Sequence, residues 1–201
     1  MKRFDSSNIV FGDNHILVVN KPAGIATQPD LVDLAKAWVK EAYQKPGRIF
    51  LEPIHRLDKP VSGLVLFART SKALSRLQEQ MRERNIEKTY EAWVEGTVVQ
   101  ESGILRHKLL HGSHRAEVSP EGKEAVLEYT VVERAEGRTK LRIQLHTGRY
   151  HQIRAQFAAT GYPVLGDAKY GSRVRWGEEI ALQAVGLVFE HPVTHKRVEI
   201  K

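Results

Sequence analysis

A single carboxylate among basic side chains is the part of this chain best suited to chemistry. Asp58 lies in the segment His55-Arg56-Leu57-Asp58-Lys59-Pro60, and a Ser-Gly pair follows at residues 62–63. An aspartate displayed in this setting can act as a nucleophile or remove a proton as a base. It can equally be a structural partner of Arg56 or Lys59, which contributes ~0–1 kcal/mol when exposed. The residues themselves leave these alternatives open.

The apolar run after the Ser-Gly pair predicts the element that displays Asp58. Residues 64–68 are short, apolar and bounded by Gly63 and Arg69, a pattern typical of a buried strand. Asp58 is therefore expected on a loop held by a rigid element, where reactive groups are commonly displayed.

Hydrophobic spacing predicts both helices and strands in the rest of the chain. Helices are expected over residues 31–42, over 71–84 with Ser71 as the cap, and over 148–159. Strands are expected at 9–11 and 15–19, as a hairpin, and at 89–99, 126–133 and 141–145. Because strands outnumber helices and short turns join several of them, we expect an α+β fold. Its core is a mixed, largely antiparallel sheet with flanking helices.

Seven segments, in order along the chain, resemble the signature of the RluA-like family of RNA pseudouridine synthases. They are Asn20-Lys21-Pro22-Ala23-Gly24, residues 55–68, residues 88–96, Gly122-Lys123-Glu124-Ala125, residues 147–154, residues 166–171 and His191-Pro192-Val193-Thr194. Each segment is weak alone, and their shared order makes the match specific. Two positions depart from the family pattern, Val61 and Tyr150, where Thr is usual.

The resemblance implies a pseudouridine synthase fold with a central catalytic cleft, formed by one catalytic domain over residues 1–201 without an N-terminal accessory RNA-binding module. It implies an enzyme that isomerises specific uridines in ribosomal or transfer RNA without a cofactor. The family's catalytic aspartate matches Asp58, which either attacks or deprotonates the ribose. Arg154 is expected to hold that carboxylate ionised, because its planar fork binds carboxylates bidentately and stays charged.

The remaining site residues take their roles from the same resemblance. Tyr90 is expected against the target base, where its ring can stack and its hydroxyl can assist proton removal from C5. Arg56 is suited to fill the space that a flipped base leaves, since guanidinium planes stack on bases. His55, Lys21 and His151 are expected to contact the substrate or support the site. His151 lies three residues before Arg154, so both are expected on one helix face.

Composition favours a polyanionic partner. The formal net charge is +7 and the sequence pI is about 9.6. A phosphate-binding surface is expected to include Lys59, Arg69, Lys72, Arg76, Arg82, Arg84, Lys169 and Arg173. With no cysteine and no apolar run near the ~20 residues of a membrane span, we expect a soluble, cytoplasmic monomer that binds RNA, neither DNA nor membranes.

Two other function classes are compatible with parts of the sequence. A ribosome-assembly or RNA-binding factor without turnover would account for the positive charge and for Val61 and Tyr150, but not for Asp58 together with Arg154. A metal-dependent RNA hydrolase could use His107, His111 and His114. This spacing suits a helix, whereas the surrounding residues predict a strand running into a turn, so no metal site is expected.

Overall fold

A computed structural model describes residues 4–44, 46–177 and 179–201. The chain divides into two compact units, each described by itself here. Unit 1 comprises Met1–Ile86 and Gly186–Lys201, and unit 2 comprises Glu87–Val185. The two ends of the chain therefore belong to the same unit, and strand β10 (Leu182–Glu190) contributes residues to both.

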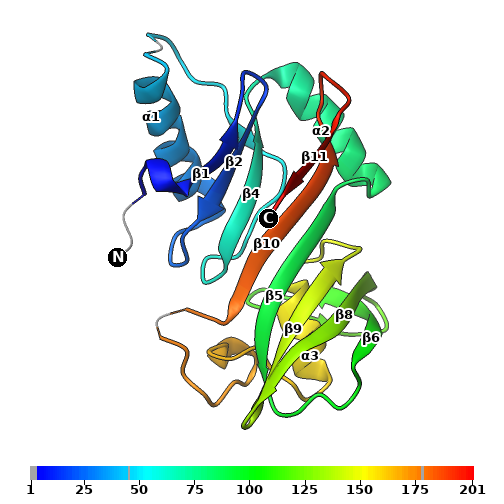
Figure 1. The fold of residues 1–201 in the computed structure, drawn as a ribbon. Coiled ribbons are helices and arrows are strands. Elements are labelled where there is room, and N and C mark those ends of the chain that lie inside the picture. Colours follow the sequence, from blue (N-terminus) through cyan, green and yellow to red (C-terminus); the bar gives the residue numbers. More distant parts are fainter. Residues whose placement is uncertain (1–3, 45, 178) are drawn as a thin grey trace. The chain divides into compact units, whose positions relative to one another are not determined.

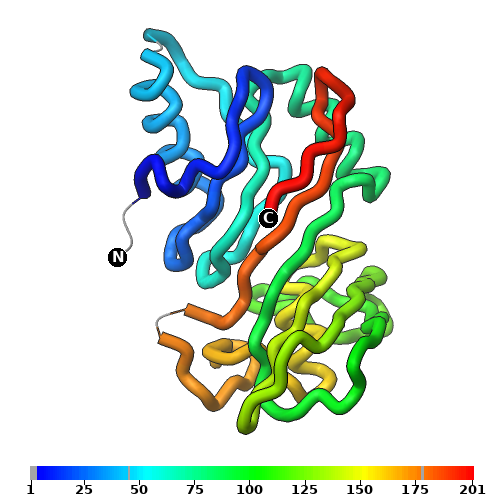
Figure 2. The backbone as a smooth tube through the Cα atoms, viewed as in Figure 1, coloured from blue at the N-terminus to red at the C-terminus, as the bar shows by residue number. Residues whose placement is uncertain are grey.

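Unit 1 is built on antiparallel strands that include the predicted hairpin (Figure 1). The strands are β1 (Ile9–Gly12), β2 (Ile16–Lys21), β3 (Glu52–Pro53), β4 (Ser62–Ala68), the second half of β10, and β11 (Arg197–Ile200). β2 pairs with β1 and with β4, and Val18 is opposite Leu66. At the end of the chain β11 folds back on β10, as the tube in Figure 2 shows. The hairpin and the buried strand after Gly63 are thus confirmed.

Helices complete unit 1. They are η1 (Ser6–Asn8), the short turn η2 (Thr27–Leu31), α1 (Val32–Ala42) and α2 (Ser71–Glu83). Ala73 and Leu77 of α2 pack with Val18, Leu66 and Phe189 in one buried apolar cluster, which fixes α2 on the sheet. The predicted cap of α2 was wrong by one residue. Thr70 has extended backbone angles and its hydroxyl accepts from the Ala73 amide at 3.1 Å, whereas Ser71 is already helical.

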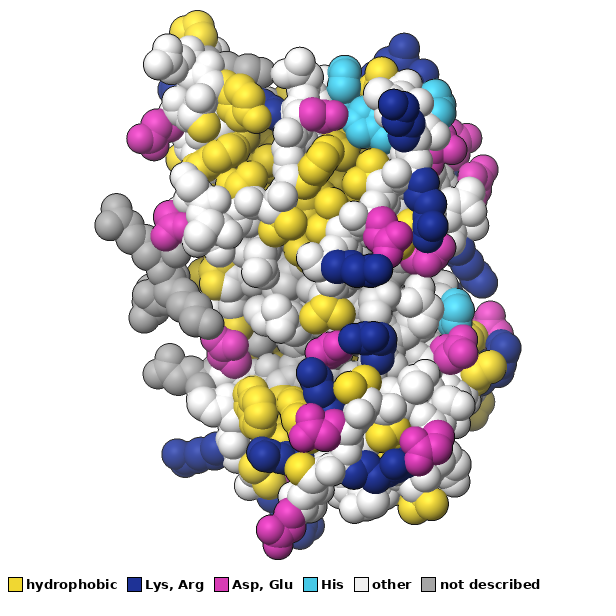
Figure 3. Space-filling view, in the orientation of Figure 1, with side chains coloured by type: hydrophobic (Ala, Val, Ile, Leu, Met, Phe, Trp, Pro, Cys, Tyr) yellow, Lys and Arg dark blue, Asp and Glu magenta, His cyan; other side chains and the backbone are white. Residues whose placement is uncertain are grey.

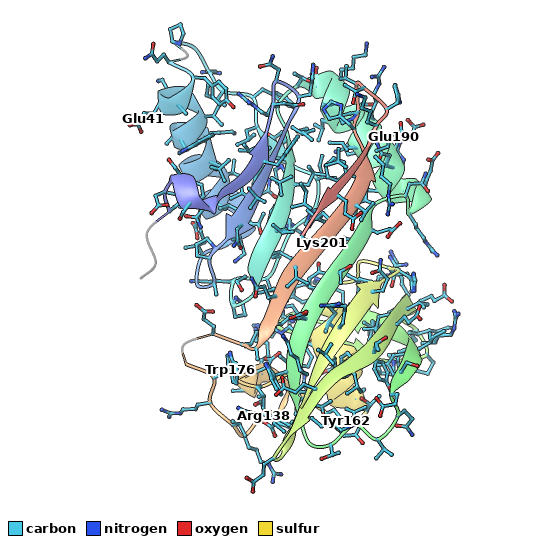
Figure 4. All side chains as sticks on the ribbon, viewed as in Figure 1. Glu41, Arg138, Tyr162, Trp176, Glu190 and Lys201 are labelled. Atoms are coloured by element: carbon cyan, nitrogen blue, oxygen red, sulfur yellow. The ribbon has the colours of Figure 1, made fainter. Side chains whose placement is uncertain are left out.

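Unit 2 is built on antiparallel strands, most of them longer than those of unit 1. Its strands are β5 (Glu87–Glu95), β6 (Ser102–His111), β7 (Ala116–Val118), β8 (Lys123–Ala135) and β9 (Arg138–Leu145), paired in the order β5-β9-β8-β6-β7. The strand predicted from 89 to 99 ends earlier, because Gly96 has a φ of 83° that breaks the ladder. Arg138, labelled in Figure 4, starts β9 and places its guanidinium over the Trp93 ring at 5.0 Å.

Helix α3 (Gln152–Ala159) covers one face of the unit 2 sheet, and η3 (Ala168–Tyr170) follows it in the chain. Gln156 donates to the carbonyls of Leu105 and Ala125 at 3.1 and 3.2 Å, and Phe157 packs edge-on against Tyr129. The helix begins four residues later than predicted. His151 has a φ of 50° in the left-handed region, so residues 147–151 form a turn rather than helix.

The α+β prediction is confirmed, since three α-helices of the described residues accompany eleven strands. The single-domain assignment and the central cleft stay predictions. No helix within the described ranges is long and apolar enough to cross a membrane. On the face shown in Figure 3, Lys and Arg side chains are interspersed with Asp and Glu.

Candidate functional site

The loop before β4 places Arg56 and Asp58 on either side of a fixed residue in unit 1. Leu57 is buried, and its backbone is held from both sides by the Thr27 hydroxyl. That hydroxyl donates to the Leu57 carbonyl at 2.9 Å and accepts from the Leu57 amide at 3.0 Å. Arg56 is exposed and Asp58 is half-buried. The burial of Leu57 thus fixes the backbone at the point from which the Arg56 and Asp58 side chains extend.

Lys21 ties this loop to the preceding Lys-Pro turn. Its side chain is fully buried, and its ammonium donates to the carbonyls of Pro22, Ile25 and Lys59 at 3.0, 2.8 and 3.3 Å. The Gly24 amide also donates to the Lys59 carbonyl, at 2.8 Å. This geometry positions the residue after Asp58. A direct contact of Lys21 with substrate stays a prediction.

His55 and Val61 brace the two ends of the same loop. The Leu66 amide donates to His55 Nε2 at 3.2 Å, so the ring proton of a neutral His55 lies on Nδ1. The Val61 amide donates to the Asp58 carbonyl at 3.0 Å, which closes a turn, and the Val61 side chain is buried. An apolar side chain therefore fits where the family usually has Thr.

In unit 2, Arg154 is held by a carboxylate that the sequence did not single out. Its Nε donates to Asp167 Oδ2 at 2.6 Å and its Nη2 to Oδ1 at 2.9 Å. The side chains are only 4% and 2% exposed. A bidentate pair with so little solvent fixes the plane of the guanidinium. Pairing of Arg154 with Asp58, which lies in unit 1, stays a prediction.

His151 and Arg154 meet at Tyr170 rather than on one helix face. The expectation of a shared face was wrong, because His151 lies in the turn before α3. Its Nδ1 is 3.0 Å from the Tyr170 hydroxyl, which accepts from the Ala116 amide at 2.8 Å. The Arg154 guanidinium carbon lies 5.0 Å from the centre of the Tyr170 ring. Tyr170 therefore contacts the turn before α3, strand β7 and the Arg154 side chain.

Tyr90 lies on the face of the unit 2 sheet that α3 covers. Tyr90 of β5 is opposite Ile143 of β9, and Ile143 is opposite Tyr129 of β8. Residues paired across strands share a face, and Tyr129 packs against Phe157 of α3. Tyr90 is 6% exposed. Its ring is thus part of the packed layer that also carries Arg154, while its contact with a base stays a prediction.

The predicted site residues form two groups in the structure. Unit 1 carries Asp58, Arg56, His55 and Lys21, and unit 2 carries Tyr90, Arg154 and His151. Sequence reasoning did not single out Asp167 and Tyr170, which contact the predicted site residues Arg154 and His151. Both lie in the segment Gly166-Asp167-Ala168-Lys169-Tyr170-Gly171, whose match to the family pattern was the available signal.

The three histidines considered for a metal have different contacts. His107 Nδ1 is 3.1 Å from Gln156 Nε2, and the His111 ring lies against Tyr150 with centroids 4.3 Å apart. The His114 carbonyl accepts from Lys169. Within residues 4–44, 46–177 and 179–201, no group of three or more His, Cys, Asp or Glu side chains is arranged to hold a metal ion.

The expected phosphate-binding surface needs one correction. Arg69 is only 7% exposed, donates to the Asp13 carbonyl and lies over the Tyr43 ring at 4.3 Å. It is therefore committed to the packing of unit 1. Lys59, Lys72 and Arg82 are exposed, as a phosphate-binding role requires.

Comparison with known proteins gives a family for this arrangement. The family model described as RNA pseudouridylate synthase matches residues 15–159. Ribosomal large subunit pseudouridine synthase D of Vibrio cholerae is 37% identical over 212 residues, which cover 96% of this chain and 65% of that protein. Dual-specificity RNA pseudouridine synthase RluA of Pasteurella multocida is 36% identical over 94% of this chain and 89% of its own length. This chain thus spans slightly less than two thirds of the Vibrio relative's length.

Solved structures give the same result for the fold. Human RNA Pseudouridylate Synthase Domain Containing 1 aligns with a TM-score of 0.81 at 25% identity, over 100% of this chain and 85% of that chain. Human RNA Pseudouridylate Synthase Domain Containing 4 aligns with a TM-score of 0.83 at 20% identity, over 97% of this chain and 87% of its own. The chain therefore belongs to the RNA pseudouridylate synthase family and to its RluA-like branch.

Proposed function

We propose that this protein isomerises specific uridines in ribosomal or transfer RNA to pseudouridine, without a cofactor. The observation that carries the proposal is the loop in which a buried Leu57 fixes an exposed Arg56 and a half-buried Asp58, within a chain of this family. Such a loop presents a carboxylate and a stacking guanidinium from a rigid base.

The reaction rearranges a single nucleoside. The bond between uracil N1 and ribose C1′ breaks, the base rejoins through C5, and the C5 proton is removed. In our proposal Asp58 either attacks C1′, forming an ester bond that breaks when C5 bonds to C1′, or removes a ribose proton and returns it afterwards. Arg154 keeps the free carboxylate ionised. Tyr90 stacks on the uracil and assists proton removal from C5, and Arg56 fills the space left by the flipped base.

The same proposal names the partner. RNA is favoured over DNA because the family is described by its action on RNA, and the formal charge of +7 suits a polyanion. We propose that the protein acts as a monomer in the cytoplasm, with His55, Lys21 and His151 supporting the bound nucleotide.

Replacement of Asp58 tests this function directly. Asp58→Asn keeps the size of the side chain and removes the charge, so tritium release from RNA labelled at uridine C5 is expected to fall below detection. The matched control is Asp33→Asn, an exposed acid in α1 that should leave the release rate unchanged. Turnover by Asp58→Asn at the wild-type rate would contradict the proposed catalytic role of Asp58. RNA binding by the wild type without any tritium release would instead identify a binding factor.

A further inference from the structure

Lys88 of β5 is a buried cation that the proposed chemistry does not use. It is 7% exposed. Within the described part of the chain, no ion pair or hydrogen bond involves its ammonium, and burial by itself lowers its pKa. A buried charge without a partner lowers the stability of the free protein. The free protein thus contains a cation without its counter-anion.

The Lys88 side chain lies close to the turn before α3. Lys88 is one residue before Thr89, which is opposite Gln144 near the end of β9. The alternation of β5 places Lys88 on the same face as Tyr90. A side-chain carbon built on Gly148 would lie 3.6 Å from the Lys88 ammonium nitrogen. Because Gly148 has no side chain, the space beside the ammonium is open on that side.

The ammonium nitrogen of Lys88 is not fully shielded from solvent. Among the described residues, the Lys88 ammonium nitrogen has no hydrogen-bond partner, but it retains some contact with solvent. An anion could therefore enter beside Gly148 without displacing an existing ion pair.

We propose that Lys88 binds a non-bridging phosphate oxygen of the RNA strand, at a nucleotide adjacent to the target uridine. This inference rests on the proposed function, because RNA supplies the anion and Tyr90 supplies the position of the target base. A lysine ammonium is a compact charge that binds phosphate without demanding a planar partner. The stability lost in the free protein is recovered when RNA neutralises the charge.

The test is Lys88→Met, which keeps the length of the side chain and removes the charge. Its dissociation constant for a uridine-containing RNA stem-loop is expected to rise about tenfold or more, as for a lost hydrogen bond to a charged group. The slope of log affinity against log salt concentration should become shallower by about 0.7–0.9, as for one phosphate contact. Urea unfolding should show a stability equal to or above that of the wild type.

Lys108→Met is the matched control, since Lys108 is an exposed lysine of β6 in the same unit. Its effect on affinity should be much smaller. If Lys88→Met bound RNA as the wild type does, or lost no more affinity than Lys108→Met, the inference would be overturned. Reduced stability with unchanged affinity would assign Lys88 to packing alone.

Binding is measured separately from turnover, so the two proposals fail in different ways. Weak RNA binding by Lys88→Met together with undiminished turnover by Asp58→Asn would retain the phosphate contact and reject the catalytic assignment. Wild-type binding by Lys88→Met together with an inactive Asp58→Asn would reject the phosphate contact alone.

Discussion

The orientation of the Arg154 guanidinium depends on Asp167. Both oxygens of this carboxylate bind the guanidinium, and neither side chain has appreciable contact with water. Asp167→Asn keeps the shape but removes the negative charge that binds the buried guanidinium of Arg154 at two nitrogens. We expect the free energy of unfolding to fall by about 3–5 kcal/mol, as for other broken buried pairs. Urea denaturation measures this loss, and tritium release at a temperature where the variant is folded should show slower turnover.

An exposed ion pair supplies the comparison for Asp167. Glu117 pairs with Arg115 at 2.9 Å, and their side chains are 59% and 53% exposed. Glu117→Gln should change the free energy of unfolding by about 0–1 kcal/mol and leave turnover unchanged. Equal losses of unfolding free energy in the two variants would show that the buried pair stabilises the protein no more than the exposed one.

The Arg154–Asp167 pair also shows what a motif can and cannot predict about a residue. The sequence predicted that Arg154 holds the Asp58 carboxylate, which stays a prediction, whereas the structure pairs Arg154 with Asp167. Its partner lies thirteen positions along the chain, beyond the last turn of α3, and is brought close by the packing of the segment that contains η3. No helical or strand spacing relates these two positions, so residue pattern alone could not have paired them.

At the scale of elements, Asp13 joins the first hairpin of unit 1 to the segment that follows β10. Its carboxylate accepts from the amides of His15 and Ile16 at 2.7 and 2.8 Å, and it lies 2.8 Å from His191 Nε2. His191 Nδ1 accepts from the amides of Val193 and Thr194. The proton of a neutral His191 ring is therefore on Nε2 and is donated to Asp13.

This contact makes the stability of the protein depend on pH in acid. Burial raises the pKa of Asp13, but the hydrogen bonds from His15, Ile16 and His191 lower it more, so the pKa lies below its ordinary value of 3.8. A lowered pKa favours the folded protein above pH 3.8, and this contribution disappears as the pH falls below that value. Asp13→Asn should remove it.

We expect Asp13→Asn to lose about 1 kcal/mol of unfolding free energy at pH 7, a modest figure because solvent screens this partly exposed carboxylate. The difference from the wild type should shrink as the pH is lowered toward 3. Urea unfolding at several pH values measures both. A difference that is constant between pH 7 and pH 3 would show that the charge of Asp13 does not contribute.

Element prediction succeeded where side chains have one buried face. α2 was placed to within one residue because Leu74, Leu77 and Met81 recur at helical spacing, and all three belong to or pack against the apolar cluster between α2 and the sheet. For β6 the sequence predicted only a strand running into a turn around His107, His111 and His114. Its start at Ser102 was not predicted, because most of its side chains are exposed or half-buried. The start of α3 was missed because the left-handed conformation of His151 has no signal in residue type.

At the scale of the whole molecule, the positive charge is unevenly divided. Unit 1 has 17 Lys and Arg against 11 Asp and Glu, a formal charge of +6, and unit 2 has 14 against 13, or +1. The sequence total of +7 predicted a polyanionic partner, but the division became visible only with the unit boundaries. Arg56 and Asp58 belong to the strongly basic unit. Most of the long-range attraction for RNA phosphates should therefore come from unit 1.

Two triple variants that remove the same charge test this division. One replaces Lys59, Lys72 and Arg82 of unit 1 with Gln, and the other replaces Arg106, Lys108 and Lys123 of unit 2, all six being exposed. The unit 1 variant should bind an RNA stem-loop more weakly, and its slope of log affinity against log salt should be shallower by about 2–3. The unit 2 variant should change the slope by less than the value of about 0.7–0.9 that one phosphate contact contributes. Fluorescence anisotropy between 50 and 200 mM salt measures both slopes. Equal slopes would mean that RNA contacts the basic side chains of the two units alike, and that the excess charge of unit 1 does not direct binding.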